Sequence, residues 1–196
     1  MQAHARKTIW VGAAAAFCQI GRSAIRSWGL GRMLGMLDQL DDIDFVLAAF
    51  REGGAWRLLD IATNEAESIE SLTHALRQIS GDSGAIGMVG VDEDFFVLVR
   101  VDGASTRVLL SDVSAAVEWA LAQSAIEHLG LPAHEEEDAE VPAGDLGILG
   151  DLGLSAAELG ALLDEDDLYP DEALSEIADR LGFGNLFDDA VGLTSA

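Results

Sequence analysis

The most constraining feature of this sequence is Phe95–Val101 (FFVLVRV), a run that is almost continuously apolar and rich in aromatic and β-branched side chains. Such a run is typical of a β-strand, and its lack of polar alternation predicts that both faces of the strand are covered. Asp102-Gly103 follows directly, and this dipeptide favours a tight hairpin turn. Thr106–Leu110 then returns as the next strand. The chain is therefore expected to contain a sheet with a buried hairpin.

Three further strands are predicted by apolar runs that lie between turn residues. Ile43–Phe50 and Trp56–Ile61 flank the turn sequence Glu52-Gly53-Gly54-Ala55, and Ala85–Val91 leads into the polar turn Asp92-Glu93-Asp94. Ile43–Phe50 is also a candidate sheet edge that would pair with a second chain. The sequence alone leaves that position and the oligomeric state open.

Two helices are predicted between these strands and after them. Asn64 is an N-cap candidate for the first, and Ser111 with Asp112 for the second, which Gly130 and Pro132 end. The first helix carries apolar residues at helical spacing at Ile69, Leu72, Leu76 and Ile79. The buried stripe predicted for the second comprises Val113, Ala116, Val117, Ala120 and Leu121.

The fold class follows from the order of these elements. Residues 42–131 are expected to form an α+β domain, with a five-stranded, mostly antiparallel sheet and two packed helices. Residues 132–143 are expected to be an acidic linker, and residues 144–192 a small, acidic, all-helical C-terminal unit. Within that unit, Ser155 and Glu158 have the spacing of a capping box.

Residues 1–37 differ from the rest, since they hold five basic residues and no acidic one. The stretch Thr8–Ile20 is apolar and follows basic residues, so it is a candidate secretory or transit signal. An alternative is that translation starts at Met36. In either case, we expect residues 1–37 to be a poorly ordered basic extension that is not part of the fold.

The net charge of −24 is concentrated in the remainder of the chain. Residues 38–131 carry a formal charge of −12, and residues 132–196 carry −17. A body this acidic repels phosphate backbones, so we expect no direct nucleic-acid binding by it, and a basic protein surface is a better partner. The alternative is that the acidity serves only to keep the protein soluble.

Known catalytic and metal-binding patterns are missing from the sequence. The single cysteine, Cys18, excludes zinc sites that need two thiolates and fits a reducing compartment. The four histidines form no zinc-hydrolase or deaminase pattern, and His74 and His128 are expected to be surface residues. The acidic cluster that begins at Asp164 has Tyr169 where a calcium loop needs glycine. We therefore expect no cofactor, no metal and no catalytic residue.

Two acidic corners are the candidate binding sites. The first is the turn after Ala85–Val91, and the second is the predicted helix start that places a proline at the first helical position. The candidate residues are Asp92, Glu93, Asp94, Tyr169, Pro170 and Asp171. Ordinary turn and helix-start chemistry is the alternative explanation for both corners.

Several stretches resemble a known bacterial family. They are DFVLAAFREGGAWRL (44–58), DEDFFVLVRVDG (92–103), VLLSDVSAAVEWALA (108–122), PAGDLGILGDLGL (142–154) and LYPDEALSEIADRLGFG (168–184). In this order they are similar to the tRNA adenosine deaminase-associated proteins, over about residues 42–191. The resemblance implies an association with the enzyme that forms inosine at the tRNA wobble position. It implies no catalytic residue.

Three functional hypotheses remain. The first is a non-catalytic, cytoplasmic accessory protein that binds the tRNA adenosine deaminase through its acidic surface. The second is a regulatory or structural protein that is linked to the deaminase only by gene neighbourhood. The third is an enzyme of unrecognised type that uses carboxylates such as Asp92, Asp94 and Asp112 near the sheet ends.

Overall fold

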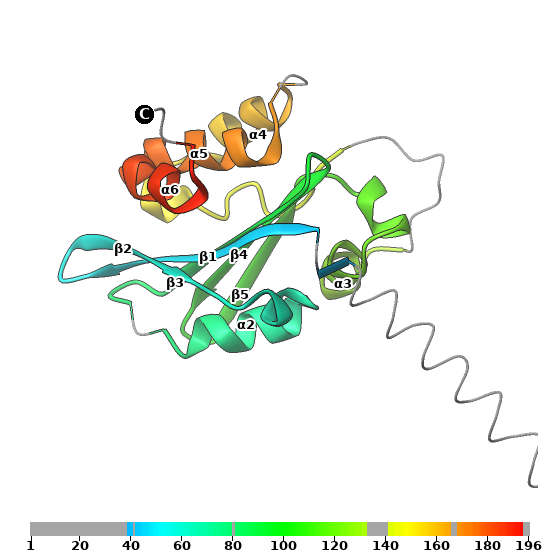
Figure 1. Cartoon of the computed structure of the whole chain (residues 1–196), viewed down its shortest axis with the longest axis horizontal. Helices are drawn as coiled ribbons and strands as arrows, with labels where there is room; N and C mark the ends of the chain where they lie inside the picture. The colour runs from blue at the N-terminus through cyan, green and yellow to red at the C-terminus, as the bar shows by residue number, and fades with distance from the viewer. Residues whose placement is uncertain (1–38, 41, 80, 133–140, 166–167, 194–196) are drawn as a thin grey trace, which may run out of the picture. The chain divides into compact units, whose positions relative to one another are not determined.

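A computed structural model of the chain describes residues 39–40, 42–79, 81–132, 141–165 and 168–193. The strands form a single sheet, and helices cover both of its faces (Figure 1). The strands are β1 (Ile43–Glu52), β2 (Ala55–Asp60), β3 (Ala85–Val91), β4 (Phe95–Asp102), β5 (Ser105–Leu110) and β6 (Ala143–Gly144).

The sheet has six strands in the order β2-β1-β3-β4-β5-β6, and every neighbouring pair is antiparallel. The prediction of five strands is therefore wrong by one. The additional strand, β6, contributes only Ala143 and Gly144, which pair with the end of β5. Gly144 has a φ of +113°, and a Cβ there would lie 2.1 Å from the carbonyl oxygen of Val108. A two-residue strand has no apolar pattern, so the sequence gives no signal for it.

Both predicted hairpin turns are present. Glu52 pairs with Ala55 across Gly53-Gly54, whose φ values are +59° and +81°. Asp102 pairs with Ser105 across a turn in which Gly103 has a φ of +55°. The backbone of both turns needs glycine because other residues rarely adopt these angles.

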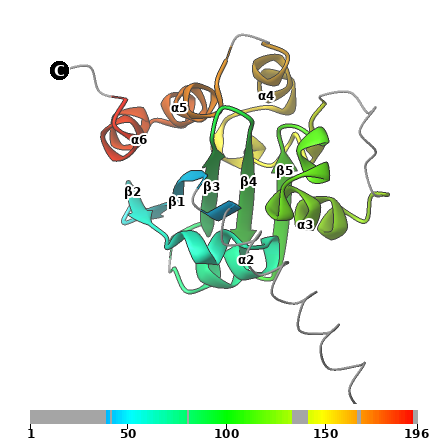
Figure 2. The same cartoon turned by 45° about the vertical axis from the view of Figure 1, so that its right-hand side comes forward.

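Strand β1 lies inside the sheet, between β2 and β3 (Figure 2). The idea that Ile43–Phe50 is a sheet edge is therefore wrong. Its apolar run reflects burial between two neighbouring strands, and β2 is the edge instead. The sheet domain therefore offers a different strand to any partner.

The first face of the sheet is covered by α2 (Ile69–Arg77) and α3 (Ala120–Leu129). These helices bury the inward apolar side chains of the strands in one cluster. Ser68 caps α2, since its hydroxyl accepts a hydrogen bond from the backbone N–H of Ser71 at 3.2 Å. The predicted cap, Asn64, lies instead in a short 3-10 turn, η1 (Thr63–Ala66).

The helix predicted after Asp112 is broken in two. A 3-10 helix, η2 (Ser114–Val117), comes first, and α3 begins only after Trp119, whose backbone is extended. Val117 is consequently exposed rather than part of a buried stripe. The predicted end is confirmed, because Gly130 is left-handed with a φ of +69°.

The second face is covered by α4 (Ala156–Leu163), α5 (Pro170–Leu181) and α6 (Gly184–Val191), which follow a short 3-10 helix, η3 (Gly150–Leu152). Their apolar side chains pack on Leu47, Ile86, Met88, Phe96, Leu98 and Leu109 of the strands. Strand β4 is thus buried on both faces, as its sequence predicts. All of the described residues belong to one compact unit.

Local capping in this helical layer agrees with the sequence. The Ser155 hydroxyl accepts from the Glu158 N–H at 3.3 Å, and the Ser155 N–H donates to the Glu158 carboxylate at 2.9 Å. Pro170 opens α5, and Gly182, with a φ of +89°, ends it. These signals are local, which explains why a sequence alone contains them.

A polar clamp fastens η3 to the second face. Arg100 on β4 is almost wholly buried and donates to Asp151 at 3.1 Å and to the Ser83 carbonyl at 2.6 Å. Arg107 on β5 donates to the other oxygen of Asp151 at 3.0 Å. Burial raises the pKa of Asp151, but the hydrogen bonds from Arg107 and Arg100 outweigh it, so this pKa lies below its ordinary value.

Two predicted segments lie outside the described residues: the basic extension (1–37) entirely, and most of the linker (132–143). No helix among the described residues is both long enough and apolar enough to cross a membrane.

Candidate acidic docking site

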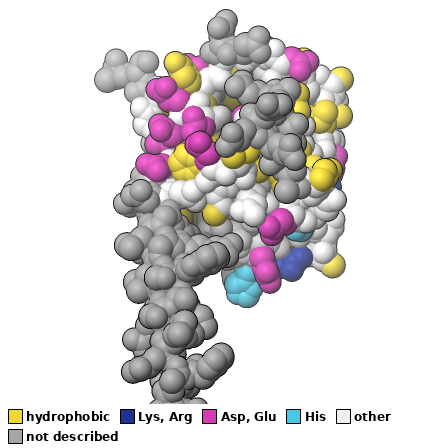
Figure 3. All heavy atoms as spheres, turned by 90° about the vertical axis from the view of Figure 1, so that its right-hand side faces the viewer, with side chains coloured by type: hydrophobic (Ala, Val, Ile, Leu, Met, Phe, Trp, Pro, Cys, Tyr) yellow, Lys and Arg dark blue, Asp and Glu magenta, His cyan; other side chains and the backbone are white. Residues whose placement is uncertain are grey.

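An acidic cleft of about 590 Å³ lies at the end of the sheet where β3 turns into β4. It is bounded by the β3–β4 turn on one side and by η2 on the other. Its lining residues are Glu93, Asp94, Asp112, Ser114, Ala115, Val117, Glu118 and Trp119. Four of these are carboxylates and none is basic. Figure 3 shows acidic side chains gathered on one part of the molecular face beside exposed apolar ones.

The β3–β4 turn presents its acids by backbone geometry. Asp92 has a φ of +45°, and the N–H of Asp94 donates to the Val91 carbonyl at 3.2 Å. The Asp92 N–H is held at 3.2 Å by the carbonyl of Asp42, which precedes β1. The side chains of Asp92, Glu93 and Asp94 are all exposed. This predicted turn is therefore built by main-chain contacts that leave its carboxylates available.

The opposite wall is held more firmly. Both oxygens of Asp112 accept from Ser114, one from the backbone N–H at 2.8 Å and one from the hydroxyl at 2.6 Å. These bonds begin η2. Trp119 packs against Phe95 with ring centroids 5.8 Å apart, which joins this wall to the sheet.

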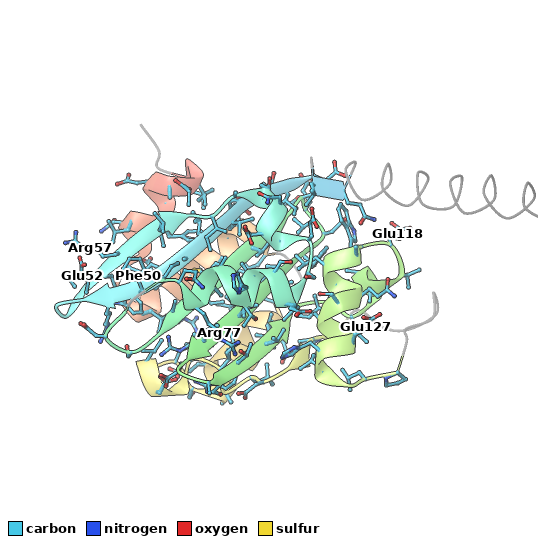
Figure 4. The ribbon with its side chains drawn as sticks, turned by 90° about the horizontal axis from the view of Figure 1, so that it is seen from below. Phe50, Glu52, Arg57, Arg77, Glu118 and Glu127 are labelled. Carbon is cyan, nitrogen blue, oxygen red and sulfur yellow. The ribbon has the colours of Figure 1, made fainter. Side chains whose placement is uncertain are left out.

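Gln39 closes the wall at its far end. Its amide donates to the carbonyl of Glu118, and its oxygen accepts from the N–H of Ala120 at 3.2 Å. The Glu118 side chain itself stays exposed at the start of α3, and Glu127 lies toward the other end of that helix (Figure 4). The cleft therefore combines fixed backbone with free carboxylates.

The second predicted corner forms the N-terminus of α5. Tyr169 is half exposed, Pro170 is buried, and Asp171 is partly exposed. The backbone N–H of Tyr169 donates to the carboxylate of Glu172 at 3.3 Å, which closes the first turn. None of these residues lines the cleft.

Asp44 on β1 is affected by the negative charge of one residue from each of the two corners. Burial raises the pKa of Asp44, and the negative charges of Asp92 and Asp171 raise it further. Asp44 is thus the carboxylate on which charges from the β3–β4 turn and from α5 both act. Asp44 is not among the residues expected from the sequence, although a lone acid near the start of the apolar run Ile43–Phe50 is a visible signal.

The arrangement suits basic ligands. A cleft lined by four carboxylates, with no Lys or Arg among the described residues of its lining, attracts basic side chains and disfavours phosphates. Among the described residues, no group of three or more His, Cys, Asp or Glu side chains is placed to hold a metal ion. Asp112 is already engaged by Ser114, whereas the side chains of Glu93, Asp94 and Glu118 form no hydrogen bond or ion pair with any residue that the structure describes.

A second cleft, of about 600 Å³, lies elsewhere on the surface between α2, α3 and β5. It contains His74 and His128, both exposed as predicted, together with Arg77 and two glutamates. Arg77, labelled in Figure 4, donates to the Thr106 hydroxyl at 3.1 Å. Its mixture of charges distinguishes it from the purely acidic cleft.

Comparison with known proteins gives a consistent assignment. Protein Rv3753c of Mycobacterium tuberculosis is 39% identical over 144 residues, which span 72% of this chain and 83% of that protein. No solved structure matches the chain significantly. The profile of Rv3753c-like tRNA adenosine deaminase-associated proteins matches residues 44–184, a range that includes both acidic corners and helices α4 and α5 and ends at the first residue of α6. The chain belongs to this family of tRNA adenosine deaminase-associated proteins.

Proposed function

We propose that this protein is a non-catalytic, cytoplasmic partner of a tRNA adenosine deaminase, and that it binds the enzyme through its acidic surface. The observation that carries the proposal is the cleft in which Glu93, Asp94 and Glu118 present carboxylates and no basic side chain from the described part of the chain takes part in the lining. The description of the family as tRNA adenosine deaminase-associated supports the choice of partner. The corner at Tyr169, Pro170 and Asp171 extends the same surface through Asp44.

The charge of the body explains how such a partner would act. An enzyme that binds tRNA needs a basic surface, and an acidic protein is complementary to that surface. Binding would be accelerated by long-range attraction and weakened by salt. The protein would then compete with tRNA for the basic surface, or control access to it.

The test is direct binding of the full-length chain to purified tRNA adenosine deaminase from the same bacterium, measured by calorimetry at 50, 150 and 500 mM NaCl. This series is informative because the screening of exposed charges by salt increases strongly between about 0.01 and 1 M. We expect affinity to fall by about tenfold or more across the series. Salt-independent binding, or none at micromolar concentrations, would contradict the proposal.

Paired variants locate the contact. The side chains of Glu93 and Asp94 make no hydrogen bond among the described residues, so Glu93→Gln with Asp94→Asn should fold normally. We expect this pair to weaken binding about fivefold to tenfold. The control is Glu70→Gln with Glu127→Gln, which removes the same charge from exposed positions on α2 and α3. Equal weakening by both pairs would mean that only net charge matters.

The same samples test the alternatives. Inosine formation in tRNA is measured with and without the protein. Binding together with a changed rate supports an accessory role. Absence of both would favour a regulatory or structural protein that is only genomically linked to the deaminase. Turnover of tRNA by this chain in the absence of the deaminase would favour an enzyme that uses the carboxylates of the cleft.

A further inference from the structure

The outer edge of β2 offers an unpaired row of backbone groups. The N–H of Ile61 donates to Val46 at 2.8 Å, and the β1–β2 register runs from there to the Glu52–Ala55 pair. In an antiparallel ladder, every second residue directs both of its backbone groups to the partner strand. Arg57 and Leu59 therefore face β1, whereas Trp56, Leu58 and Asp60 direct their N–H and C=O groups outward.

This edge is protected only by its shortness and by the charges of Arg57 and Asp60. Proteins commonly blunt an exposed edge with charged side chains, proline, a bulge or a covering segment. Strand β2 contains no proline and pairs with β1 in unbroken register. No strand among the described residues lies beyond it, and the hairpin projects from the body (Figures 1 and 4). Leu59 on this strand is 50% exposed.

An apolar groove runs beside the same edge. It has a volume of about 370 Å³ and lies between β2 and α6. Its apolar lining residues are Leu47, Trp56, Leu58, Leu59, Leu186 and Ala190. Leu186 is 44% exposed. The groove is thus continuous with the unpaired edge.

The wall of the groove is rigid. The indole N–H of Trp56 donates to the Leu181 carbonyl at 2.9 Å, and its ring packs on Phe183 with centroids 4.6 Å apart. The guanidinium carbon of Arg51 lies over the indole ring, 4.7 Å from its centroid. A strand that added to β2 would therefore meet a preformed surface.

The charges around the groove indicate what kind of protein segment it would bind. Arg57 is neutralised by Glu52 at 3.3 Å, whereas Asp60 and Asp189 have no ion-pair partner among the described residues. The groove is accordingly negative as well as apolar. A second copy of this chain is a poor occupant, because two bodies with this excess of acids repel one another.

We propose that β2 receives an extended segment of a basic partner protein as a seventh strand of the sheet. Backbone hydrogen bonds to Trp56, Leu58 and Asp60 would supply affinity, and alternate apolar side chains would enter the groove. A Lys or Arg of the segment would pair with Asp60 or Asp189. This inference rests on the proposed function, since the partner used to test it is the tRNA adenosine deaminase.

The key variant is Asp60→Pro. It removes one outward N–H but spares the ladder to β1, because the donors of Leu59 and Ile61 remain. Asp60→Asn is the matched control, since it removes the same charge and keeps the N–H. Both full-length variants are compared with the wild type by calorimetry against the purified deaminase, after circular dichroism and thermal melting have confirmed their folding.

We expect Asp60→Asn to weaken binding about threefold or less and Asp60→Pro to weaken it about tenfold or more. Leu186→Gln removes an exposed apolar side chain of the groove without changing its charge and should weaken binding about fivefold, which keeps the test valid if Asp60→Pro does not fold. Binding of Asp60→Pro and Leu186→Gln equal to that of Asp60→Asn would overturn the β2 inference and leave the proposed function intact. No binding by the wild type would overturn both.

A third outcome would show that the strand added to β2 comes from a second copy of this chain and not from a basic partner protein. If sedimentation shows a dimer of this chain that Asp60→Pro dissociates, the edge serves self-association, and the inference is wrong about the occupant.

Discussion

The two faces of the sheet are covered in different ways. The first face is closed by α2 and α3, which are connected to the strands by short segments, and its buried cluster consists of apolar side chains. The second face is closed by helices that follow all five long strands in the sequence, and it contains the buried Arg100. The comparison indicates that chain connectivity suffices to place the first layer, whereas the second layer also has a polar clamp.

The clamp explains how a separate segment reaches one defined position. Arg100 and Arg107 share Asp151, so η3 can satisfy both guanidinium groups only in one register against the sheet. Apolar packing alone is less directional. A buried, fully charged donor left without its acceptor is costly, and this cost penalises misplaced arrangements.

The largest effect is expected when the helical layer on the second face is deleted altogether. Deletion of residues 141–196 would expose the strand residues Leu47, Ile86, Met88, Phe96, Leu98 and Leu109 as one apolar surface. We expect loss of the soluble monomer, measured by the soluble fraction and by dye binding to exposed apolar surface. Addition of residues 141–196 as a separate peptide should reduce the dye signal. A monomeric, cooperatively unfolding deletion product would show that the second face needs no cover.

Two adjacent residues of β5 compare the faces directly. Leu109 faces the second layer and Leu110 the first, and both are fully buried. We expect Leu109→Ala and Leu110→Ala each to lower the free energy of unfolding by about 2–5 kcal/mol, because each leaves a cavity. Chemical denaturation should show one transition in both variants. A loss below about 1 kcal/mol for Leu109→Ala would mean that the second layer is loosely packed.

The clamp predicts a smaller, pH-dependent effect. Asp151→Asn deprives Arg100 of its anionic partner and should cost about 1–3 kcal/mol at neutral pH. The lowered pKa of Asp151 means that its contribution is present above its ordinary value of 3.8 and is lost as the pH falls through the lowered value. The stabilities of variant and wild type should therefore converge in acid.

The control for the clamp is Asp145→Asn. Asp145 lies 3.7 Å from Arg107 and is half exposed, so its removal should cost less than about 1 kcal/mol. Equal losses for Asp145→Asn and Asp151→Asn would argue against a special role for the buried arginine.

The smallest expected effect is a gain in thermal stability, caused by the substitution Asp44→Asn. Burial and the charges of Asp92 and Asp171 raise the pKa of Asp44, so its ionised form is less favourable in the folded protein than in the unfolded one. The wild type therefore loses some stability as the pH rises through the raised pKa. Asp44→Asn should raise Tm at pH 7 by about 1 °C. No gain at pH 7, or an equal gain at pH 3, would contradict this.

Local signals in the sequence predicted most of this fold. The hairpin turns at Gly53-Gly54 and Asp102-Gly103 and the caps at Ser155 and Gly182 depend on neighbouring residues, and each is present. The features that the sequence did not predict depend on distant contacts. The strand β6 exists only because β5 is there to pair with it.

The candidate site shows the same division. The exposed turn at Asp92, Glu93 and Asp94 was predictable, because three consecutive acids between two strands indicate a turn. The wall formed by Asp112 and Trp119 was not, since the helix break at Trp119 accompanies its packing on Phe95 in a neighbouring strand. The apolar Phe95–Val101 run did predict cover on both faces, but not which segment supplies the second layer.

The order of the layers along the chain has a consequence during synthesis. Strands β1 to β5 leave the ribosome well before α5 and α6, and domains generally fold as their residues emerge. The first face can close as soon as α3 is available, but the cover of the second face is complete only after Phe187 has been added. The nascent chain therefore passes through a stage with an uncovered apolar sheet, which is when it depends most on protection by chaperones.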